Sequence, residues 1–500
     1  MRLLTTVGSK VMENAETKST AASPRATAGM QAFLLAIVLA APALRCLQHP
    51  YVTDNDIWWH LATGDWIRAH HAVPHVEIFS RGIAGSPWHA YSWLFELLVS
   101  FLFSALGLRG MVLLTAGLTV AIAAALFLMI HRIQPDFSVA AVLTFVAGFS
   151  MIHMETPRPW LFSILALVLE VDLLLRSRRD GKAARLLWLP VIFAVWANVH
   201  IQFLDGLVVL FLACVESIAG LRVESLRTKL RPAVLIPFSV ATLLATLVNP
   251  YGWRLYQDAF ALSTQSGVMS KIGELQAIPF RDAIDFSALG LLLVATVVLT
   301  SQGKLISLEA AWLGFAALVA FRSQRDVWVL AIMASVAIAS VRFERKKETA
   351  PLPGWGGVVA LGMAVLAMVA GFGLFDVSNA KLGQLQAKEL PVHAVEFVEQ
   401  SHLAGPLYND FGWGGYLLWS LRQPVAIDGR AALYGDQRID RSVSTWEGRP
   451  NWASDPQLQS AGMVVGPVNS PLTQLLRTDG RFRLGYEDKL AVVFVAVSKP

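Results

Sequence analysis

Long runs of hydrophobic residues, interrupted by short polar segments, fill most of the chain between residues 28 and 375. A helix needs about 20 mostly apolar residues to cross the hydrocarbon core of a bilayer. Twelve runs come near that length: 30–47, 90–106, 110–130, 138–152, 160–175, 186–203, 205–220, 232–248, 284–300, 305–321, 326–341 and 355–375. Their apolar residues do not alternate with polar ones, which predicts an α-helical membrane bundle of about eleven or twelve helices and excludes a barrel of strands.

The last 125 residues have a different pattern, with charged residues throughout and no apolar run long enough to cross a membrane. The segment 390–402 predicts a short amphipathic helix with Pro391 near its start. Runs of strand-forming residues follow at 424–427, 463–465 and 490–497. We therefore expect three parts: a polar tail at 1–27, a membrane domain at 28–375 with a long loop at 48–89, and a small α/β domain at 376–500.

Composition supports a membrane protein, because 55% of the residues are hydrophobic and only 15% are charged. Charged residues usually supply about a quarter of a soluble domain. The net charge of +5 is weak evidence for nucleic-acid binding, which we do not expect, and it fits basic cytoplasmic loops better. Cys46 and Cys214 lie far apart in apolar runs and predict neither a disulfide framework nor a metal knuckle.

The positions of Lys and Arg predict an orientation, because short cytoplasmic loops carry an excess of both. The basic segments are 1–27, 176–185, 222–231 and 342–347. The loop 48–89 and the segment 249–283 hold few basic residues, so we expect them, and the C-terminal domain, on the outer face.

This orientation requires an odd number of crossings between the loop 48–89 and the basic segment 176–185, where the pattern shows four apolar runs. The run 138–152 is the shortest of the four. We therefore expect eleven full crossings, with this run re-entering the membrane or lying partly outside it.

The loop 48–89 carries the most distinctive motif, in which Asp54 and Asp56 precede two tryptophans and His60. Two carboxylates at this spacing can share a divalent cation such as Mg²⁺ or Mn²⁺, or one can act as a base while the other orients it. The same residues fit an interfacial helix capped by Asp54 or Asp56. Both interpretations stay open, and the histidines of this loop match no metal-ligand spacing.

Other polar residues stand where predicted helices end on the outer side. Guanidinium groups at a membrane surface suit phosphate, because their fork binds two oxygens, although arginines also reach lipid head groups without a specific role. The candidates for binding substrate or phosphate are His60, Arg158, His200, Arg322 and Arg325. The candidates for a second site are Glu274, Asp410, Asp428 and Arg430. For Asp428 and Arg430, a buried structural ion pair is the alternative interpretation.

The order of the elements along the chain carries one resemblance, and five stretches carry a narrower one: 56–61, 196–200, 249–252, 409–417 and 427–430. A helix, an outer loop opened by an acidic pair, many further helices and an outer C-terminal domain resemble the architecture of the GT-C glycosyltransferases. This superfamily includes protein O-mannosyltransferases, lipid A aminoarabinose transferases and oligosaccharyltransferase catalytic subunits. More narrowly, the chain is similar to a group of bacterial multi-spanning membrane proteins.

The resemblance implies a bacterial inner-membrane enzyme that moves a hexosyl or pentosyl group from a polyprenyl-phosphate carrier to an acceptor outside the cytoplasm. In that family an acidic residue of the first loop activates the acceptor or holds a metal, and Asp54 and Asp56 are the matching positions. A carboxylate there would act as the base, and Arg322 or Arg325 would stabilise the departing phosphate. A transporter or flippase of a lipid-linked substrate and a non-catalytic membrane scaffold of the same fold are the alternatives.

Overall fold

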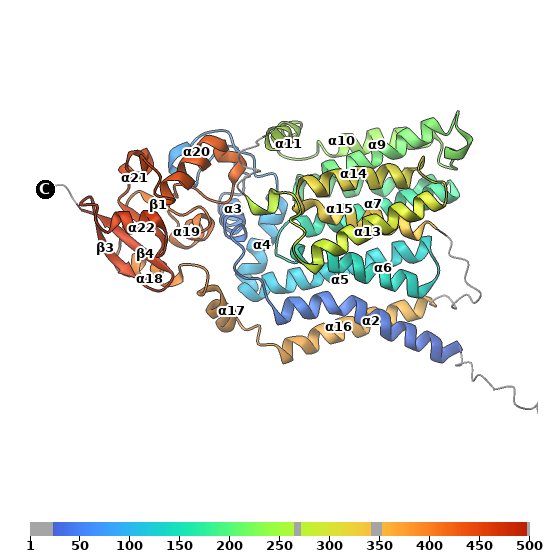
Figure 1. Ribbon diagram of the computed structural model, residues 1–500, viewed down its shortest axis with the longest axis horizontal. Helices are drawn as coiled ribbons and strands as arrows, with labels where there is room; N and C mark the ends of the chain where they lie inside the picture. The colour runs from blue at the N-terminus through green and yellow to red at the C-terminus, as the bar shows by residue number, and fades with distance from the viewer. Residues whose placement is uncertain (1–23, 265–271, 342–352, 498–500) are drawn as a thin grey trace, which may run out of the picture.

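The computed structural model describes residues 24–264, 272–341 and 353–497. Most of the tail at 1–27 and the whole basic segment 342–347 lie outside the described residues. Figure 1 shows a long bundle of helices with a smaller part at one end that contains the strands. This arrangement confirms the expected fold class, a helical bundle with a small C-terminal sheet region.

Within the described residues, eleven helices run along the bundle. They are α2 (Pro24–Gln48), α5 (Leu108–Ile133), α6 (Phe137–Ser150), α7 (Trp160–Asp180), α8 (Trp188–Val199), α9 (Phe203–Ala219), α10 (Pro232–Ala245), α13 (Ala283–Ser301), α14 (Leu308–Arg322), α15 (Val327–Ala339) and α16 (Gly354–Leu374). All thirteen residues of α15 are buried, so this helix lies inside the bundle.

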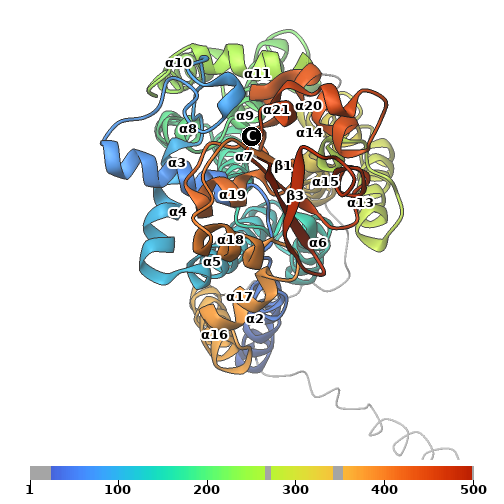
Figure 2. The ribbon, with the colours of Figure 1, turned by 90° about the vertical axis from the view of Figure 1, so that its left-hand side faces the viewer.

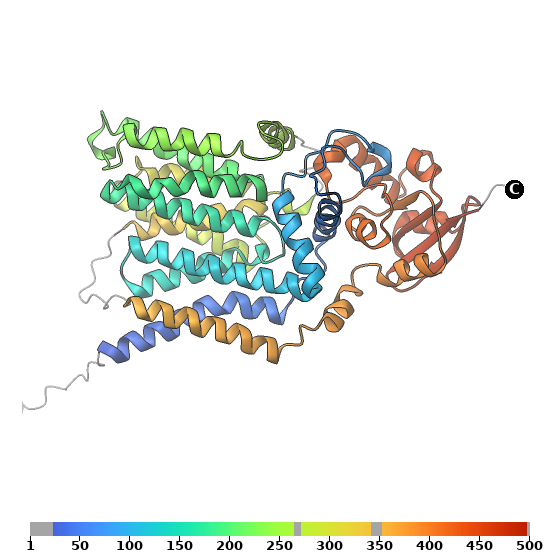
Figure 3. The same ribbon diagram turned by 180° about the vertical axis from the view of Figure 1, so that it is seen from behind.

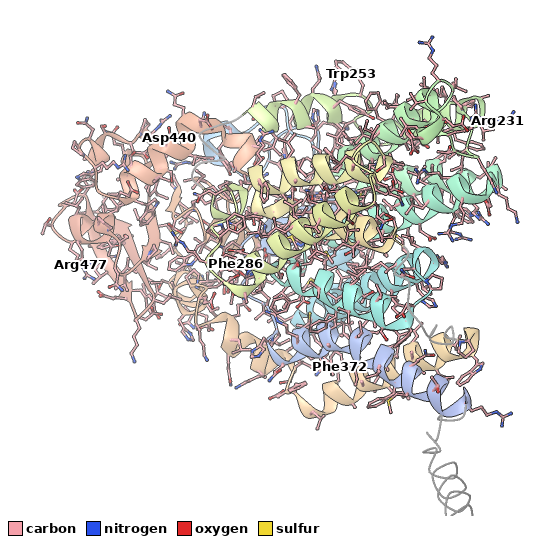
Figure 4. The ribbon with its side chains drawn as sticks, turned by 45° about the vertical axis from the view of Figure 1, so that its right-hand side comes forward. Arg231, Trp253, Phe286, Phe372, Asp440 and Arg477 are labelled. Atoms are coloured by element: carbon pink, nitrogen blue, oxygen red, sulfur yellow. The ribbon has the colours of Figure 1, made fainter. Side chains whose placement is uncertain are left out.

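The surface of the bundle is apolar. Phe211, Leu318 and Leu366 are each more than 60% exposed, and Trp253 and Phe286 also stand on the surface (Figure 4). By length and composition, four helical segments of the described chain are able to cross a membrane: Thr27–Gln48, Leu108–Ile133, Ala283–Ser301 and Gly354–Leu374. Large exposed apolar areas are uncommon on soluble monomers. The surface therefore fits a protein embedded in lipid.

The remaining apolar run, 90–106, forms α4 (Trp93–Leu106), which lies across the end of the bundle instead of along it (Figure 3). Trp93 Nε1 donates to Asn198 Oδ1 beside the end of α8, at 2.7 Å. The Leu106 carbonyl accepts from Asn379 Nδ2, which follows α16, at 2.9 Å. Both ends of α4 therefore meet groups at the same end of the bundle.

The run 138–152, which we expect to re-enter the membrane or to lie partly outside it, forms α6. Helix α6 runs between the two ends of the bundle. Before it, Gln134 Nε2 donates to the Val341 carbonyl after α15, at 2.9 Å, and at its end Ser150 Oγ lies 2.8 Å from Ser287 Oγ near the start of α13. Between the loop 48–89 and the basic segment 176–185, the helices that run along the bundle are α5, α6 and α7. Their number is odd, as the orientation predicted from the basic segments requires. That these helices cross a membrane stays a prediction.

The part after α16 contains six helices within the described residues: α17 (Asn379–Gln386), α18 (Val392–Gln400), α19 (Gly414–Leu421), α20 (Ala431–Trp446), α21 (Pro456–Gln459) and α22 (Pro471–Leu476). Its strands are β1 (Leu407–Asn409), β2 (Met463–Pro467), β3 (Phe482–Glu487) and β4 (Ala491–Ala496). The sheet order is β1-β2-β4-β3, with β1 parallel to β2 and the other pairs antiparallel. Figure 2 shows this part covering the end of the bundle, with α2 and α16 paired at the edge.

Two of the expected strands are β2 and β4, and the expected amphipathic helix is α18. The expected strand at 424–427 is wrong, because this segment does not join the described sheet. Instead, Val425 exchanges backbone hydrogen bonds of 3.0 Å with Phe79 and Arg81 of the loop 48–89. Val425, Ala426 and Ile427 are apolar because all three are buried.

The loop 48–89 contains α3 (Ile57–His70), which lies between the bundle and the C-terminal part (Figure 1). The ring of Trp58 stands 5.1 Å from that of Tyr416 and 5.0 Å from that of Trp419, both in α19. A Cβ atom on Gly415 would clash with the Asn55 carbonyl, so this glycine permits the close approach of α19. The loop and the C-terminal part therefore share one apolar core.

Candidate functional site

A cavity of about 280 Å³ lies where the bundle, the loop 48–89 and the C-terminal part meet. Its charged and other polar lining residues include Asp56, His60, Ser92, Glu96, Arg158, His200, Asp258, Glu274, Arg325 and Arg430. The rings of Trp59, Trp88, Tyr91 and Trp160 also line it. Most of the residues that the sequence singled out are thus brought together, although they come from distant segments.

Asp54 and Asp56 have different roles at the start of α3. Asp54 is 1% exposed, and its Oδ1 accepts from the backbone N–H of Asp56 at 2.8 Å and of Ile57 at 3.2 Å. Asp56 is the residue before the helix, but its side chain makes no capping bond. Asp54 therefore closes the turn, and the carboxyl group of Asp56 faces the cavity.

Arg158 joins the carboxylates of this wall. Its Nε donates to Asp54 Oδ2 at 2.6 Å, and its Nη1 lies 3.0 Å from Asp56 Oδ2 and 2.8 Å from Glu274 Oε2. The guanidinium also stands 4.7 Å from the ring of Trp160. Glu274, which we assigned to a second site, is therefore part of the same group as Asp54 and Asp56. Because the guanidinium of Arg158 is paired with these three carboxylates, it is not free to bind a phosphate through two N–H groups.

Burial raises the pKa of Asp56 to about 7. The guanidinium of Arg158 opposes this shift, whereas the negative charges of Asp54 and Glu274 add to it. Because 22% of the Asp56 side chain is still exposed, the group can exchange a proton with a molecule in the cavity. A carboxyl group with a pKa near the working pH is suited to general acid–base catalysis.

Arg325 approaches the cavity from the turn between α14 and α15. Its Nη2 lies 3.2 Å from His200 Nε2, and its Nη1 lies 3.7 Å from Glu274 Oε1. Arginine can only donate, so His200 Nε2 accepts and the ring proton is on Nδ1, which faces Ser163 Oγ at 2.8 Å. Among the described residues, the buried Arg325 Nε has no hydrogen-bond partner. Arg325 therefore keeps a donor for a ligand, and His200 orients it.

Arg322 does not share this position, although the sequence grouped it with Arg325. It is exposed at the end of α14 and is not among the described residues that line the cavity. The chain turns back between the two arginines, so only Arg325 faces the cavity. The prediction that Arg322 binds the departing phosphate has no support in this geometry.

Asp428 and Arg430 form a buried ion pair, which is the alternative to a second binding site in the interpretation of the sequence. Arg430 Nη2 lies 2.6 Å from Asp428 Oδ2, and Arg430 Nη1 lies 2.6 Å from Glu77 Oε2. Glu77 could not be singled out from the sequence, because a single glutamate in a long loop has no distinguishing motif. Gly429, between the pair, lies against the site: a Cβ atom there would overlap Asp56 Oδ1.

Asp410 does not line the cavity in the described structure. Its Oδ1 accepts from the backbone N–H of Gly412 at 2.9 Å, so it holds the turn before α19. Burial raises the pKa of Asp410. We therefore assign Asp410 to the structure of this turn.

The residues suggested as metal ligands, Asp54 and Asp56, do not fit a resident cation in this arrangement, because Arg158 already occupies the space between their oxygens. A different group within the described residues has ligand atoms within 4.8 Å of one another: His153, Asp282 and Asp285. Two of these side chains are exposed, and Asp282 also caps α13. Exposed acidic groups of this kind are common without a metal.

The bundle, the loop 48–89 and the C-terminal part together have a GT-C-type fold, which is also the fold of solved oligosaccharyltransferase structures. A crystal structure of the Archaeoglobus fulgidus oligosaccharyltransferase tethered to an acceptor peptide with the NVT sequon is similar, with a TM-score of 0.50 and 10% identity over 93% of this chain and 74% of that chain. The apo form of that enzyme gives a TM-score of 0.51 and 10% identity over 88% and 69%. At this identity the likeness shows the fold alone. No protein-family model matches the chain, and no curated protein sequence matches it significantly.

Proposed function

We propose that the protein is a membrane glycosyltransferase that moves a sugar from a polyprenyl-phosphate carrier to an acceptor outside the cytoplasm. One observation carries the proposal: Asp56, with a pKa of about 7, and Arg325, with an unpartnered N–H, line the same cavity at the end of an apolar bundle. The fold supports the proposal, since it is the fold of enzymes that transfer sugars at membranes.

The reaction needs a base for the acceptor and a cation for the leaving group. The carboxylate of Asp56 takes the proton of the acceptor hydroxyl, and the acceptor oxygen forms a bond to the anomeric carbon. The bond between that carbon and the phosphate oxygen breaks, and the polyprenyl phosphate leaves with the electron pair. Arg325 stabilises the negative charge that develops on this phosphate.

The other residues position these two groups. Arg158 holds Asp56 beside Asp54 and Glu274, and His200 holds Arg325. A divalent cation on Asp54 and Asp56 would have to displace Arg158, so no step above uses one. We place the site on the outer face of a bacterial inner membrane, with membrane lipids around the bundle. In support, Arg231 of the basic segment 222–231 stands at the end opposite Asp440 and Arg477 of the C-terminal part (Figure 4).

The proposal is tested by incubating the purified protein and an extracytoplasmic membrane fraction with a panel of polyprenyl-phosphate sugars and measuring release of the carrier. Arg325→Met removes the cation from the cavity, and we expect a loss of about 100-fold in turnover, the size found when one stabilising donor is removed. Arg322→Met is the matched control and should retain activity. Equal loss in both variants, or in neither, would contradict the role of Arg325.

A further inference from the structure

Helices α3 and α4 form one wall of the cavity, and this wall carries polar groups that the proposed reaction does not use. Glu96 is 0% exposed, Ser92 1% and His60 3%, and all three line the cavity. His60 Nδ1 lies 3.2 Å from Glu96 Oε1. A carboxyl, a hydroxyl and an imidazole thus meet in a buried place between two helices.

Two polar atoms of this wall lack a partner. Among the described residues, no hydrogen-bonding group reaches Glu96 Oε2 or Ser92 Oγ, although both atoms are buried. Buried polar atoms nearly always have a hydrogen-bond partner, because leaving one unpaired is costly. Since both residues line the cavity, a molecule bound there can supply the missing partner.

The chemistry of the wall points to hydroxyl groups. The oxygen of Glu96 pairs with a hydroxyl, and Ser92 both donates and accepts. A phosphate would be repelled by the carboxylate of Asp56, and Arg325 of the same cavity offers it a cation. Aromatic rings, including Trp88 and Tyr91, line the same cavity and offer faces on which a flat apolar surface can pack.

The size of the cavity limits the ligand. Ligand cavities commonly begin at about 300 Å³. A cavity of about 280 Å³ therefore suits one sugar ring.

We infer that the wall formed by α3 and α4, centred on Glu96 and Ser92, is a subsite that binds the hydroxyl groups of a single sugar. His60 positions Glu96 through the bond to Oε1. The assignment of this sugar to a polyprenyl-phosphate donor rests on the proposed function, whereas binding of the sugar itself does not. The substrate class is then a carrier with one monosaccharide, its sugar on this wall and its phosphate at Arg325.

The test uses the full-length protein in lipid nanodiscs and two separate probes. Saturation-transfer NMR detects methyl glucoside, methyl mannoside and methyl arabinofuranoside, which carry no phosphate and no lipid. Calorimetry measures binding of undecaprenyl phosphate, which carries no sugar. Glu96→Ala removes both carboxyl oxygens, and Ser92→Ala removes only the hydroxyl, so it keeps the test open if the larger change prevents folding. Glu170→Ala is the matched control, because Glu170 is also 0% exposed with both oxygens unpartnered in the described structure but does not line the cavity.

We expect at least one glycoside to give a signal with the wild type and with Glu170→Ala. We expect Glu96→Ala and Ser92→Ala to weaken it by about tenfold, the effect of losing a hydrogen bond to a charged or polar partner. All variants should bind undecaprenyl phosphate as the wild type does. Absence of a glycoside signal in the wild type, or equal loss in Glu96→Ala and Glu170→Ala, would overturn the sugar subsite. A wild type that binds a glycoside but neither binds undecaprenyl phosphate nor releases it would overturn the proposed function and leave the subsite.

Discussion

At the scale of single residues, the acidic pair shows how two neighbouring carboxylates acquire different roles. Asp54 caps α3 and holds Arg158, and this leaves Asp56 with a carboxyl that faces the cavity. The two interpretations of the acidic pair therefore apply to different residues: the helix cap to Asp54, and the carboxyl group available for chemistry to Asp56. Sequence alone could not divide them, because the division depends on Arg158, which lies about a hundred residues further along the chain.

The pKa of Asp56 predicts the pH dependence of transfer. A base must be deprotonated, so the rate should rise with pH, with a midpoint at about 7. Because the charge of Glu274 raises the pKa of Asp56, Glu274→Gln should lower that pKa and move the midpoint to lower pH. The measurement is a pH–rate profile of both proteins, with Asp440→Asn on the exposed surface as the control. A midpoint that stays in place or moves to higher pH would contradict this assignment.

At the scale of elements, the site depends on the contact between the loop 48–89 and the C-terminal part. The sequence predicted β2, β4, α18 and most of the bundle, because their hydrophobic patterns are regular. It did not predict that 424–427 pairs with the loop, or that Glu77 joins Arg430, because these contacts connect segments more than 300 residues apart. Apolar composition also did not distinguish α4, which lies across the bundle, from helices that run along it.

The close approach of Gly429 to Asp56 predicts a specific sensitivity. Gly429→Ala places a methyl group where it overlaps the carboxyl oxygen of Asp56 and pushes that group out of position. Misplacement of a reacting group by about 1 Å costs on the order of 100-fold in rate. We expect this loss in a transfer assay, with little change in melting temperature. Gly480→Ala, whose new Cβ atom would meet nothing within 4 Å, is the control and should behave as the wild type. Unchanged activity in Gly429→Ala would show that the loop does not constrain Asp56.

At the scale of the whole molecule, an apolar bundle separates a basic end from the end that carries the cavity. This arrangement predicts which positions are accessible from each side of a membrane. In a chain with Cys46 and Cys214 replaced by alanine, the substitutions His71→Cys, Arg109→Cys and Gly480→Cys should react with an impermeant maleimide added outside intact cells. Lys229→Cys should react only after the cells are permeabilised. His71 and Arg109 flank α4, so labelling from opposite sides would show that α4 crosses the membrane and would refute its assignment to the outer surface.

The central claim is that Asp56 acts as the base of a sugar-transfer reaction. The most direct measurement compares the wild type with Asp56→Asn for release of polyprenyl phosphate from a lipid-linked monosaccharide, at equal expression and membrane insertion. Asp54→Asn is measured in parallel, because it alters the cap of α3 and leaves the Asp56 carboxyl in place. The account predicts that Asp56→Asn abolishes release while the protein still inserts and melts as the wild type does. Full activity of Asp56→Asn would contradict it, whatever the activity of Asp54→Asn.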